Sequence, residues 1–295
     1  MYITIKEASL KWEISERRIR KLCEEGRIAG AVKVGKSWNI PKEASKPQRK
    51  NLSTDIFAEI ERKRALLSNK RPLTQGELER LNRQFMVEYT YNSNAIEGNT
   101  LTLRETDMVL RGLTIQQKPL KDHLEAVGHK DAFAYICSVV GEKQPISEWL
   151  IKQIHSLVLA DKPMDRGVYR RVEVNIMGAL HKPVQPYLIQ ERMKELIKNY
   201  IADSDENFIQ KLAKFHIEFE AIHPFIDGNG RTGRLLVNFE LMKAGYPPID
   251  IKYADRNAYY RAFDSFHGDG DLSPMTNLFA GYINQKLDEY LKIIN

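Results

Sequence analysis

The chain has 295 residues, of which 42% are hydrophobic and 28% charged, so it can form two domains with real cores and lacks the composition of a disordered protein. No stretch approaches about 18 apolar residues, and the first residues lack the pattern of a secretory signal. We therefore expect a cytoplasmic protein that does not span a membrane. Two cysteines, Cys23 and Cys137, are too few for a disulfide framework.

The net charge of +6 comes from the first fifty residues. These residues contain 13 Lys and Arg against 6 Glu and no Asp, whereas the rest of the chain has 32 basic and 33 acidic residues. A basic module attached to a near-neutral body indicates that the module binds a polyanion. A basic terminus that only aids solubility is the alternative.

The same residues follow the outline of a small winged helix-turn-helix. We expect helices over 5–12 and 16–25, with Ser15 capping the second, and a small hairpin over 31–40. This outline resembles the N-terminal modules of excisionase and MerR-like proteins.

The second helix and the hairpin would present basic side chains to a partner. A helix of this kind places its charges against phosphates and groove edges, so we predict duplex DNA as the partner. A module that docks a protein or dimerises is the alternative. The candidate DNA-binding residues are Arg17, Arg18, Arg20, Lys21, Lys33 and Lys36.

A polar stretch without periodicity, 46–54, is expected to link the module of residues 1–45 to a second domain of residues 55–295. The second domain shows helical periodicity nearly throughout, so its fold class is mainly α. The β-prone stretch 168–185 is the exception, and we expect one hairpin there. The expected helices cover 55–67, 74–89, a stretch that starts at the capping box of Thr102 and Glu105, 122–140, 147–160, 189–202, 206–222, 230–244, 255–267 and 274–293.

One twelve-residue segment, HPFIDGNGRTGR at 223–234, lies between two apolar helices and carries the most chemistry. Its glycines leave main-chain N–H groups free at the start of the second helix, which suits phosphate binding. Arg231 and Arg234 are three residues apart and share a helix face. Asp227 can hold Mg²⁺ on the phosphates, and His223 can accept a proton from an attacking hydroxyl. Together these groups indicate phosphoryl-type transfer.

The segment matches the Fic family signature, HPFx(D/E)GNGRxxR, at every fixed position, and the chain resembles Fic proteins over roughly 55–290. The resemblance implies an all-helical domain with one hairpin that moves AMP from ATP to a hydroxyl of a target protein or of itself, with Mg²⁺. By motif position, His223 would be the general base and Asp227 the Mg²⁺ ligand, while Arg231 would contact the β-phosphate and Arg234 the γ-phosphate. The ATP-binding residues would be Gly228, Asn229, Gly230, Arg231, Thr232, Gly233 and Arg234, with the Asn229 side chain contributing.

Two further segments resemble parts of the same family. The stretch 168–185, with Met177 and Gly178, is similar to the Fic flap, whose strand edge pairs with the backbone of the target protein. A plain surface hairpin is the alternative. Tyr259 and Tyr260 lie in a segment similar to the wall of the adenine pocket, so one of them would contact the base.

The residues SNAIEG, 93–98, fit a second Fic signature, the inhibitory motif (S/T)xxxE(G/N), with Ser93, Glu97 and Gly98 at its fixed positions. A short helix ending at Gly98 would project Glu97 toward Arg234 and occupy the guanidinium meant for the γ-phosphate. An ordinary solvated glutamate is the alternative. The resemblance also offers Glu97 a role in orienting a water that removes AMP from a modified target.

Three functions stay open at this point. The first is AMP transfer restrained by Glu97, and the second is other chemistry on the same fold, such as AMP removal or transfer of another nucleotide, phosphocholine or phosphate. The third is a DNA-binding regulator whose body senses ATP. The intact Gly228-Asn229-Gly230 favours AMP transfer, because Doc-like phosphate-transferring relatives replace a loop glycine with lysine. An oligomer is compatible with the sequence.

Overall fold

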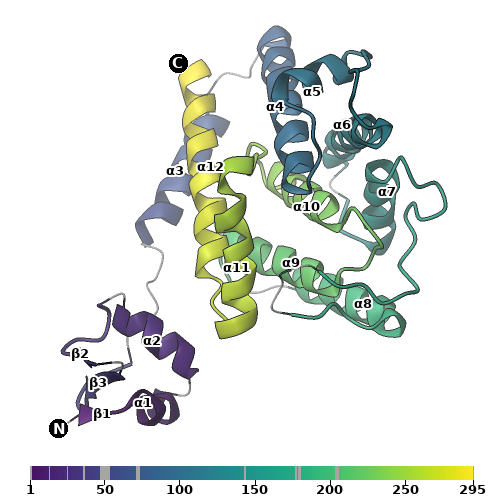
Figure 1. The fold of residues 1–295 in the computed structure, drawn as a ribbon. Helices are drawn as coiled ribbons and strands as arrows, with labels where there is room; N and C mark the ends of the chain where they lie inside the picture. The colour runs from purple at the N-terminus through teal and green to yellow at the C-terminus, as the bar shows by residue number, and fades with distance from the viewer. Residues whose placement is uncertain are drawn as a thin grey trace.

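The computed structural model describes residues 1–295 except 1, 13, 25, 36, 47–53, 71–73, 143, 177, 179–180, 203–205 and 295. The described chain forms a small N-terminal module and a larger helical body (Figure 1). Most of the expected linker lies outside the described residues, so the domain boundary near residue 45 stays a prediction. Within the described residues, no helix has both the length and the apolarity needed to cross a bilayer.

The N-terminal module contains the two helices and the hairpin predicted for it. These are α1 (Ile5–Trp12), α2 (Glu16–Glu24), β2 (Val32–Val34) and β3 (Ser37–Pro41). A two-residue strand that the sequence did not indicate, β1 (Tyr2–Ile3), extends the antiparallel sheet to the order β1-β3-β2. The identification of this module as a winged helix-turn-helix stays a prediction. Its separate core consists of Ala8, Trp12, Ile19, Leu22, Cys23, Ile28 and Ile40.

The body is helical, as its periodicity predicts, and the helices lie within a few residues of the expected ranges apart from one longer helix. They are α3 (Thr54–Ser68), α4 (Gln75–Ile96), α5 (Leu103–Leu110), α6 (Leu120–Val140), α7 (Glu148–Val158), α8 (Ile189–Ile201), α9 (Phe208–Ile222), α10 (Asn229–Lys243), α11 (Arg256–Asp269) and α12 (Ser273–Ile294), with short 3-10 turns η1 (Pro186–Leu188) and η2 (Tyr253–Asp255).

Helix α4 is the longer one, because it continues past the predicted end near residue 89 to Ile96. The predicted capping boxes open α4 at Thr74 and α5 at Thr102, with the side-chain and main-chain bonds of both boxes formed. Residues 93–98 therefore lie at the end of a 22-residue helix, not on a short helix of their own. Gly98 follows with a φ of 93°, a left-handed conformation that suits glycine after a helix.

Helix α10 lies at the centre of the body, where it packs against α9, α6, α7 and α4. Helix α12 runs along α3 and α11 on one side of this arrangement (Figure 1). Fully buried aromatic side chains fill the space between these helices, among them Phe219 of α9, Phe239 of α10 and Phe279 of α12. The packing fixes both ends of the loop between α9 and α10, which carries the Fic-like signature.

The stretch 168–185 does not form the predicted hairpin, because none of its described residues is in a β-strand. A buried arginine ties the stretch together instead. The Arg170 guanidinium donates to the main-chain carbonyls of His223 and Val172, each at 2.8 Å, and to that of Val184. The Arg170 N–H also donates to the Pro224 carbonyl at 2.9 Å. One side chain thus replaces a ladder of strand hydrogen bonds and fixes the stretch to the signature loop.

Replacing Arg170 by Met should destabilise the body, because four carbonyl groups, including that of Ile222, would lose a charged donor. We expect a loss of about 2 kcal/mol, which for a domain of this size lowers the melting temperature by about 5 °C. The neighbouring, exposed Arg171 provides the control. Arg171→Met should have the melting temperature of the wild type when both are measured by calorimetry under the same conditions. Equal melting of all three proteins would show that Arg170 does not hold the stretch.

Candidate active site

The signature loop is shaped by two residues with left-handed backbone conformations. His223 ends α9 with a φ of 50°, and Gly228 begins α10 with a φ of 75°. A Cβ on Gly228 would also approach the Val158 side chain to 3.3 Å, so both conformation and space favour glycine there. The Asn229 side chain closes the loop, donating to the carbonyl and accepting from the N–H of Phe225, each at 2.9 Å. Its polar atoms are thus committed to the loop itself.

His155 of α7 packs against the loop and bonds its backbone. The sequence analysis did not identify this residue. Its Nδ1 accepts from the Gly167 N–H at 2.9 Å, so Nε2 carries the proton and donates to the Asp227 carbonyl at 3.0 Å. The imidazole also stacks on Phe225, with ring centroids 3.6 Å apart. Burial lowers the pKa of His155 to about 4, which keeps the ring neutral. A single histidine on an apolar helix face gave no signal of this role.

Arg234 and Glu97 meet at the start of α10. Arg234 is 3% exposed, and its guanidinium donates to the Ser93 hydroxyl at 3.0 Å, the Ser93 carbonyl at 2.7 Å and the Glu97 carboxylate at 2.8 Å. Burial alone would lower the pKa of Arg234, but the Glu97 carboxylate raises it above its usual value. The Glu97 carboxylate also covers Gly230 so closely that a Cβ there would clash with it. The structure thus places the end of α4 against the start of α10, where the sequence predicts phosphate binding.

His223 and Glu220 face the same cavity. Burial lowers the pKa of His223 to about 4, so its imidazole is neutral and can accept a proton at neutral pH. Glu220 lies one turn earlier on α9, with its carboxylate 4.0 Å from His223 Nδ1. Burial and the nearby Glu97 raise the pKa of Glu220 to about 8, so this carboxyl is largely protonated at neutral pH. The sequence analysis assigned Glu220 no role in the site, because an acidic residue within a helix is most often solvated.

Asp227 and Arg231 belong to a line of alternating charges on the other side of the loop. Asp227 accepts from the Lys162 ammonium at 2.6 Å and from Arg231 at 3.3 Å. Burial alone would raise the pKa of Asp227, but these cations lower it to about 2. Arg231 is 1% exposed and also pairs with Glu125 at 3.2 Å. The two arginines of the signature therefore have different partners instead of sharing one open face.

The Asp227 carboxylate fits Mg²⁺ in its chemistry. It is ionised, partly exposed and adjacent to the start of α10, and Mg²⁺ commonly binds through one or two carboxylates together with substrate phosphates. No cluster of three or more His, Cys, Asp or Glu suited to a metal occurs among the described residues. A metal on Asp227 would therefore take most of its ligands from a nucleotide and water.

A cavity of about 380 Å³ opens beside these groups. The end of α4, the stretch 168–185, the signature loop and α11 all contribute to its walls. Gly230 and Arg234 line it, whereas Thr232 is fully buried and Gly233 lies against Glu220 and His216 of α9. The described lining residues are Glu97, Ile176, Gly178, His181, Glu220, His223, Gly230, Arg234, Tyr259, Tyr260, Phe263 and Asp264.

The other predicted cavity residues divide between wall and core. Tyr259 also borders the cavity, but it is 2% exposed and its hydroxyl lies 2.6 Å from Nε2 of His216, so most of its side chain is packed in the core. Tyr260 is 45% exposed and its hydroxyl donates to the Ile96 carbonyl at 3.0 Å. Gly178 lines the cavity, while Met177 lies outside the described residues.

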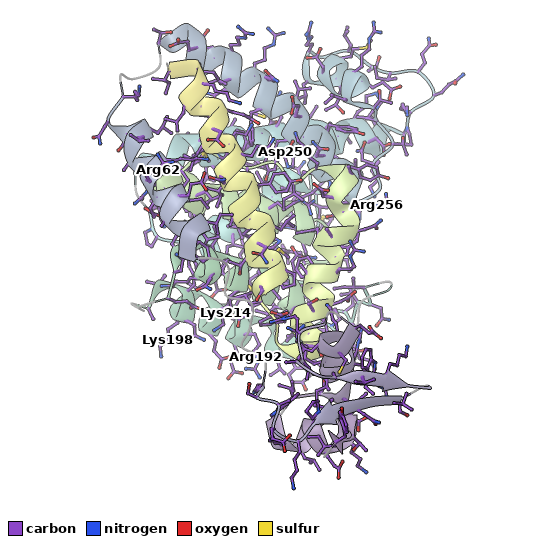
Figure 2. The ribbon with its side chains drawn as sticks, turned by 90° about the vertical axis from the view of Figure 1, so that its left-hand side faces the viewer. Arg62, Arg192, Lys198, Lys214, Asp250 and Arg256 are labelled. Carbon is purple, nitrogen blue, oxygen red and sulfur yellow. The ribbon has the colours of Figure 1, made fainter. Side chains whose placement is uncertain are left out.

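The predicted DNA-binding residues that the structure describes lie on α2 and β2. Arg17, Arg20, Lys21 and Lys33 are exposed, and Lys36 lies outside the described residues. Arg18 differs, because it pairs with Asp271 of the body at 3.2 Å. The Ser15 hydroxyl similarly donates to Asp269 at 2.9 Å. In Figure 2, Arg256 marks the start of α11, and the module lies at the other end of this helix.

Residues 145–241 match the model of the Fic/DOC family, a range that includes the signature loop. The chain is 32% identical over 251 residues to a protein adenylyltransferase Fic from Nematostella vectensis, covering 83% of this chain and 58% of that one. It is 34% identical over 223 residues to the protein of the same name from Drosophila melanogaster, covering 74% and 44%. The chain thus spans about half the length of these curated relatives.

Solved structures agree with these matches. Fic-1 (aa134–508) from C. elegans superimposes with a TM-score of 0.72 at 28% identity, covering 81% of this chain and 72% of that one. A Fic domain containing signaling protein from Bacteroides thetaiotaomicron gives a TM-score of 0.67 at 29% identity, covering 81% and 96%. The chain is therefore a Fic-domain protein, homologous to the proteins named protein adenylyltransferase Fic.

His155 and His216 should each lower the stability as the pH drops below about 6.5, because they are buried in the neutral form, whereas the raised pKa of Glu220 acts in the opposite direction. Burial lowers their pKa values to about 4 and about 3 from 6.5, so between these values the unfolded chain binds protons that the folded chain does not. Each histidine should cost about 1.4 kcal/mol at pH 5.5. Urea unfolding at pH 7.5 and 5.5 measures the change in stability, and His155→Phe should remove the contribution of His155 from that change. An equal pH dependence in the variant would contradict the assignment.

Proposed function

We propose that this protein transfers AMP from ATP to a hydroxyl side chain of a protein and restrains this activity with Glu97. The observation that carries the proposal is the position of Glu97, which covers Gly230 and pairs with Arg234 at 2.8 Å inside a complete Fic signature loop. The names of the curated relatives, protein adenylyltransferase Fic, support the same chemistry.

The cavity groups supply what such a transfer needs. The target hydroxyl oxygen attacks the α-phosphorus of ATP. The bond between the α-phosphorus and the oxygen that bridges it to the β-phosphate breaks, and pyrophosphate leaves. His223 accepts the hydroxyl proton, since its low pKa leaves it neutral. The main-chain N–H groups at the start of α10 and the Arg234 guanidinium bind the phosphates. Mg²⁺ held by Asp227 would neutralise charge on the phosphates when it is bound.

Arg231 has a different part in this proposal from the contact with the β-phosphate that the family resemblance implied. Its side chain is buried between Glu125 and Asp227. We assign it to holding the Asp227 carboxylate in place, which leaves Arg234 as the signature arginine that meets the nucleotide in the cavity.

Glu97 restrains the reaction in two ways. Its carboxylate takes a donor of Arg234 that the γ-phosphate would use. It also places a negative charge over Gly230, where the helix terminus would otherwise attract phosphate. A nucleotide bound beside Glu97 would have its phosphates displaced, and a displacement of about 1 Å can cost about a hundredfold in rate.

The remaining contacts extend the proposal to the substrates. The exposed ring of Tyr260 at the cavity wall is positioned to contact the adenine. The stretch 168–185 borders the cavity and would dock the target backbone next to His223. Arg170 bonds both this stretch and the His223 carbonyl. The same side chain therefore holds in place the segment that docks the target and the residue that accepts the proton.

Glu97→Gly should raise self-modification in Mg²⁺-ATP at least tenfold, because it frees Arg234 and uncovers Gly230. Intact mass spectrometry should detect added AMP, and His223→Ala in the same background should abolish it. Glu142→Gly, which removes an exposed glutamate after α6, is the matched control and should behave as the wild type. An unchanged rate in Glu97→Gly would contradict the restraint. Incubating pre-modified protein without ATP separates transfer from removal of AMP.

The basic N-terminal module favours a second function, binding of duplex DNA. The exposed side chains of Arg17, Arg20 and Lys21 on α2 support it, since clustered cations on one helix suit a phosphate backbone. We exclude Arg18 from this contact while it pairs with Asp271, and assign it to docking the module on the body.

Binding of a fluorescent duplex to the full chain should weaken at least tenfold when Arg17, Arg20 and Lys21 are all changed to Gln, and the salt slope should become shallower. The control removes three positive charges around α5 and α6, at the end of the body far from the module (Figure 1), with Arg104, Arg111 and Lys121 changed to Gln. Equal weakening by both variants would indicate attraction by net charge alone.

A further inference from the structure

Lys162 is a cation next to the signature loop that neither the sequence analysis nor the proposed mechanism uses. It lies in the turn after α7, and its ammonium contacts the Asp227 carboxylate at 2.6 Å. This contact occupies Oδ2, while Oδ1 accepts from the Gly228 N–H at 2.6 Å and from Arg231 at 3.3 Å. Both oxygens of the carboxylate that would bind a metal are therefore already engaged.

The partners of Asp227 differ in how easily they can leave. Arg231 is 1% exposed and anchored by Glu125, and the Gly228 N–H belongs to the loop backbone. The Lys162 side chain is 39% exposed and reaches Asp227 from outside. The backbone of its turn is fixed, because the Lys162 carbonyl accepts from the Asp165 N–H at 3.0 Å and Arg166 bonds the Leu159 carbonyl at 3.2 Å. Only the Lys162 side chain can move aside without disturbing the loop.

The charges around Asp227 also indicate that Lys162 must leave when a metal binds. The Asp227 carboxylate already faces two cations, Lys162 and Arg231, so its charge is balanced before any metal arrives. A divalent cation on Asp227 would stand a few ångströms from the Lys162 ammonium, and like charges at that separation repel strongly at a partly buried site. The metal and the lysine therefore compete for one carboxylate.

We propose that Lys162 is a tethered counter-cation of Asp227 which a divalent metal must displace, so that it sets how strongly the metal assists nucleotide binding. The inference rests on the proposed metal role of Asp227 and makes Lys162 a positioning residue rather than a catalytic one. Without metal, the ammonium keeps the carboxylate ionised and in place. When nucleotide and metal bind, the lysine side chain swings out to solvent.

The experiment measures metal assistance directly, without turnover. Calorimetric titration gives the affinity of the full chain for the non-hydrolysable analogue α,β-methylene-ATP, once in saturating Mg²⁺ and once in EDTA. The ratio of the two affinities is the coupling between metal and nucleotide. All variants carry Glu97→Gly, so that Glu97 does not obstruct the nucleotide in either condition.

Lys162→Met should raise this ratio about tenfold over the parent, or about 1.4 kcal/mol, because the metal no longer displaces a cation. Lys162→Arg keeps the charge and should keep the parent ratio. Lys121→Met is the matched control, since Lys121 pairs with Glu125 at 3.5 Å at the far end of the same line of charges and does not touch Asp227. Its ratio should stay within about twofold of the parent.

Two results overturn the inference, and they are distinguishable. If Asp227→Ala lowers the ratio at least tenfold but Lys162→Met leaves it unchanged or lowers it, the metal role stands and the competition by Lys162 is refuted. If Asp227→Ala leaves the ratio unchanged, the metal role in the proposed function fails, and the inference fails with it. Melting temperatures equal to the parent's establish that the exposed Lys162 variants are folded.

Discussion

The buried guanidinium of Arg234 is the constraint on which the rest of the site depends. A charge that is 3% exposed must be paired and hydrogen-bonded, because burying it alone would cost several kcal/mol. Its partners, Ser93 and Glu97, come from the end of α4, about 140 residues earlier in the chain. The length of α4 therefore has a consequence for the site, since a helix ending near residue 89 would not place these groups beside α10.

The same pairing connects stability to restraint. While the cavity holds no nucleotide, Glu97 satisfies Arg234 and lies over Gly230, so under the proposed function the nucleotide-free state is also the restrained state. A phosphate group can replace the carboxylate as partner of the guanidinium, because both present oxygens to a planar set of donors. In the proposed mechanism, activation exchanges the Glu97 carboxylate for a phosphate as the partner of Arg234, so this buried cation keeps an anionic partner.

The loop itself is held by two neutral side chains, Asn229 and His155, and by one buried guanidinium, that of Arg170. Asn229 uses both ends of its amide on Phe225, and His155 uses both ring nitrogens, one on Gly167 and one on Asp227. Arg170 joins the loop to the stretch that borders the cavity. Rigid support of this kind matters because phosphoryl-type transfer depends on positioning and electrostatics more than on covalent chemistry by the protein. The charged side chains of Arg234 and Asp227 then lie on opposite sides of a rigid loop.

The sequence by itself determined the local structure: the helices, the two capping boxes, the small hairpin of the N-terminal module and the glycine-rich signature with its family resemblance. These features follow from periodicity, caps and turn chemistry within a few residues. It did not determine which distant side chains meet. Tertiary structure decided that Arg231 pairs with Glu125 while Arg234 pairs with Glu97, that Lys162 reaches Asp227, and that Arg170 replaces the expected strand ladder. The physical reason is that a buried polar group must find a partner wherever packing places one, and sequence spacing does not encode that place.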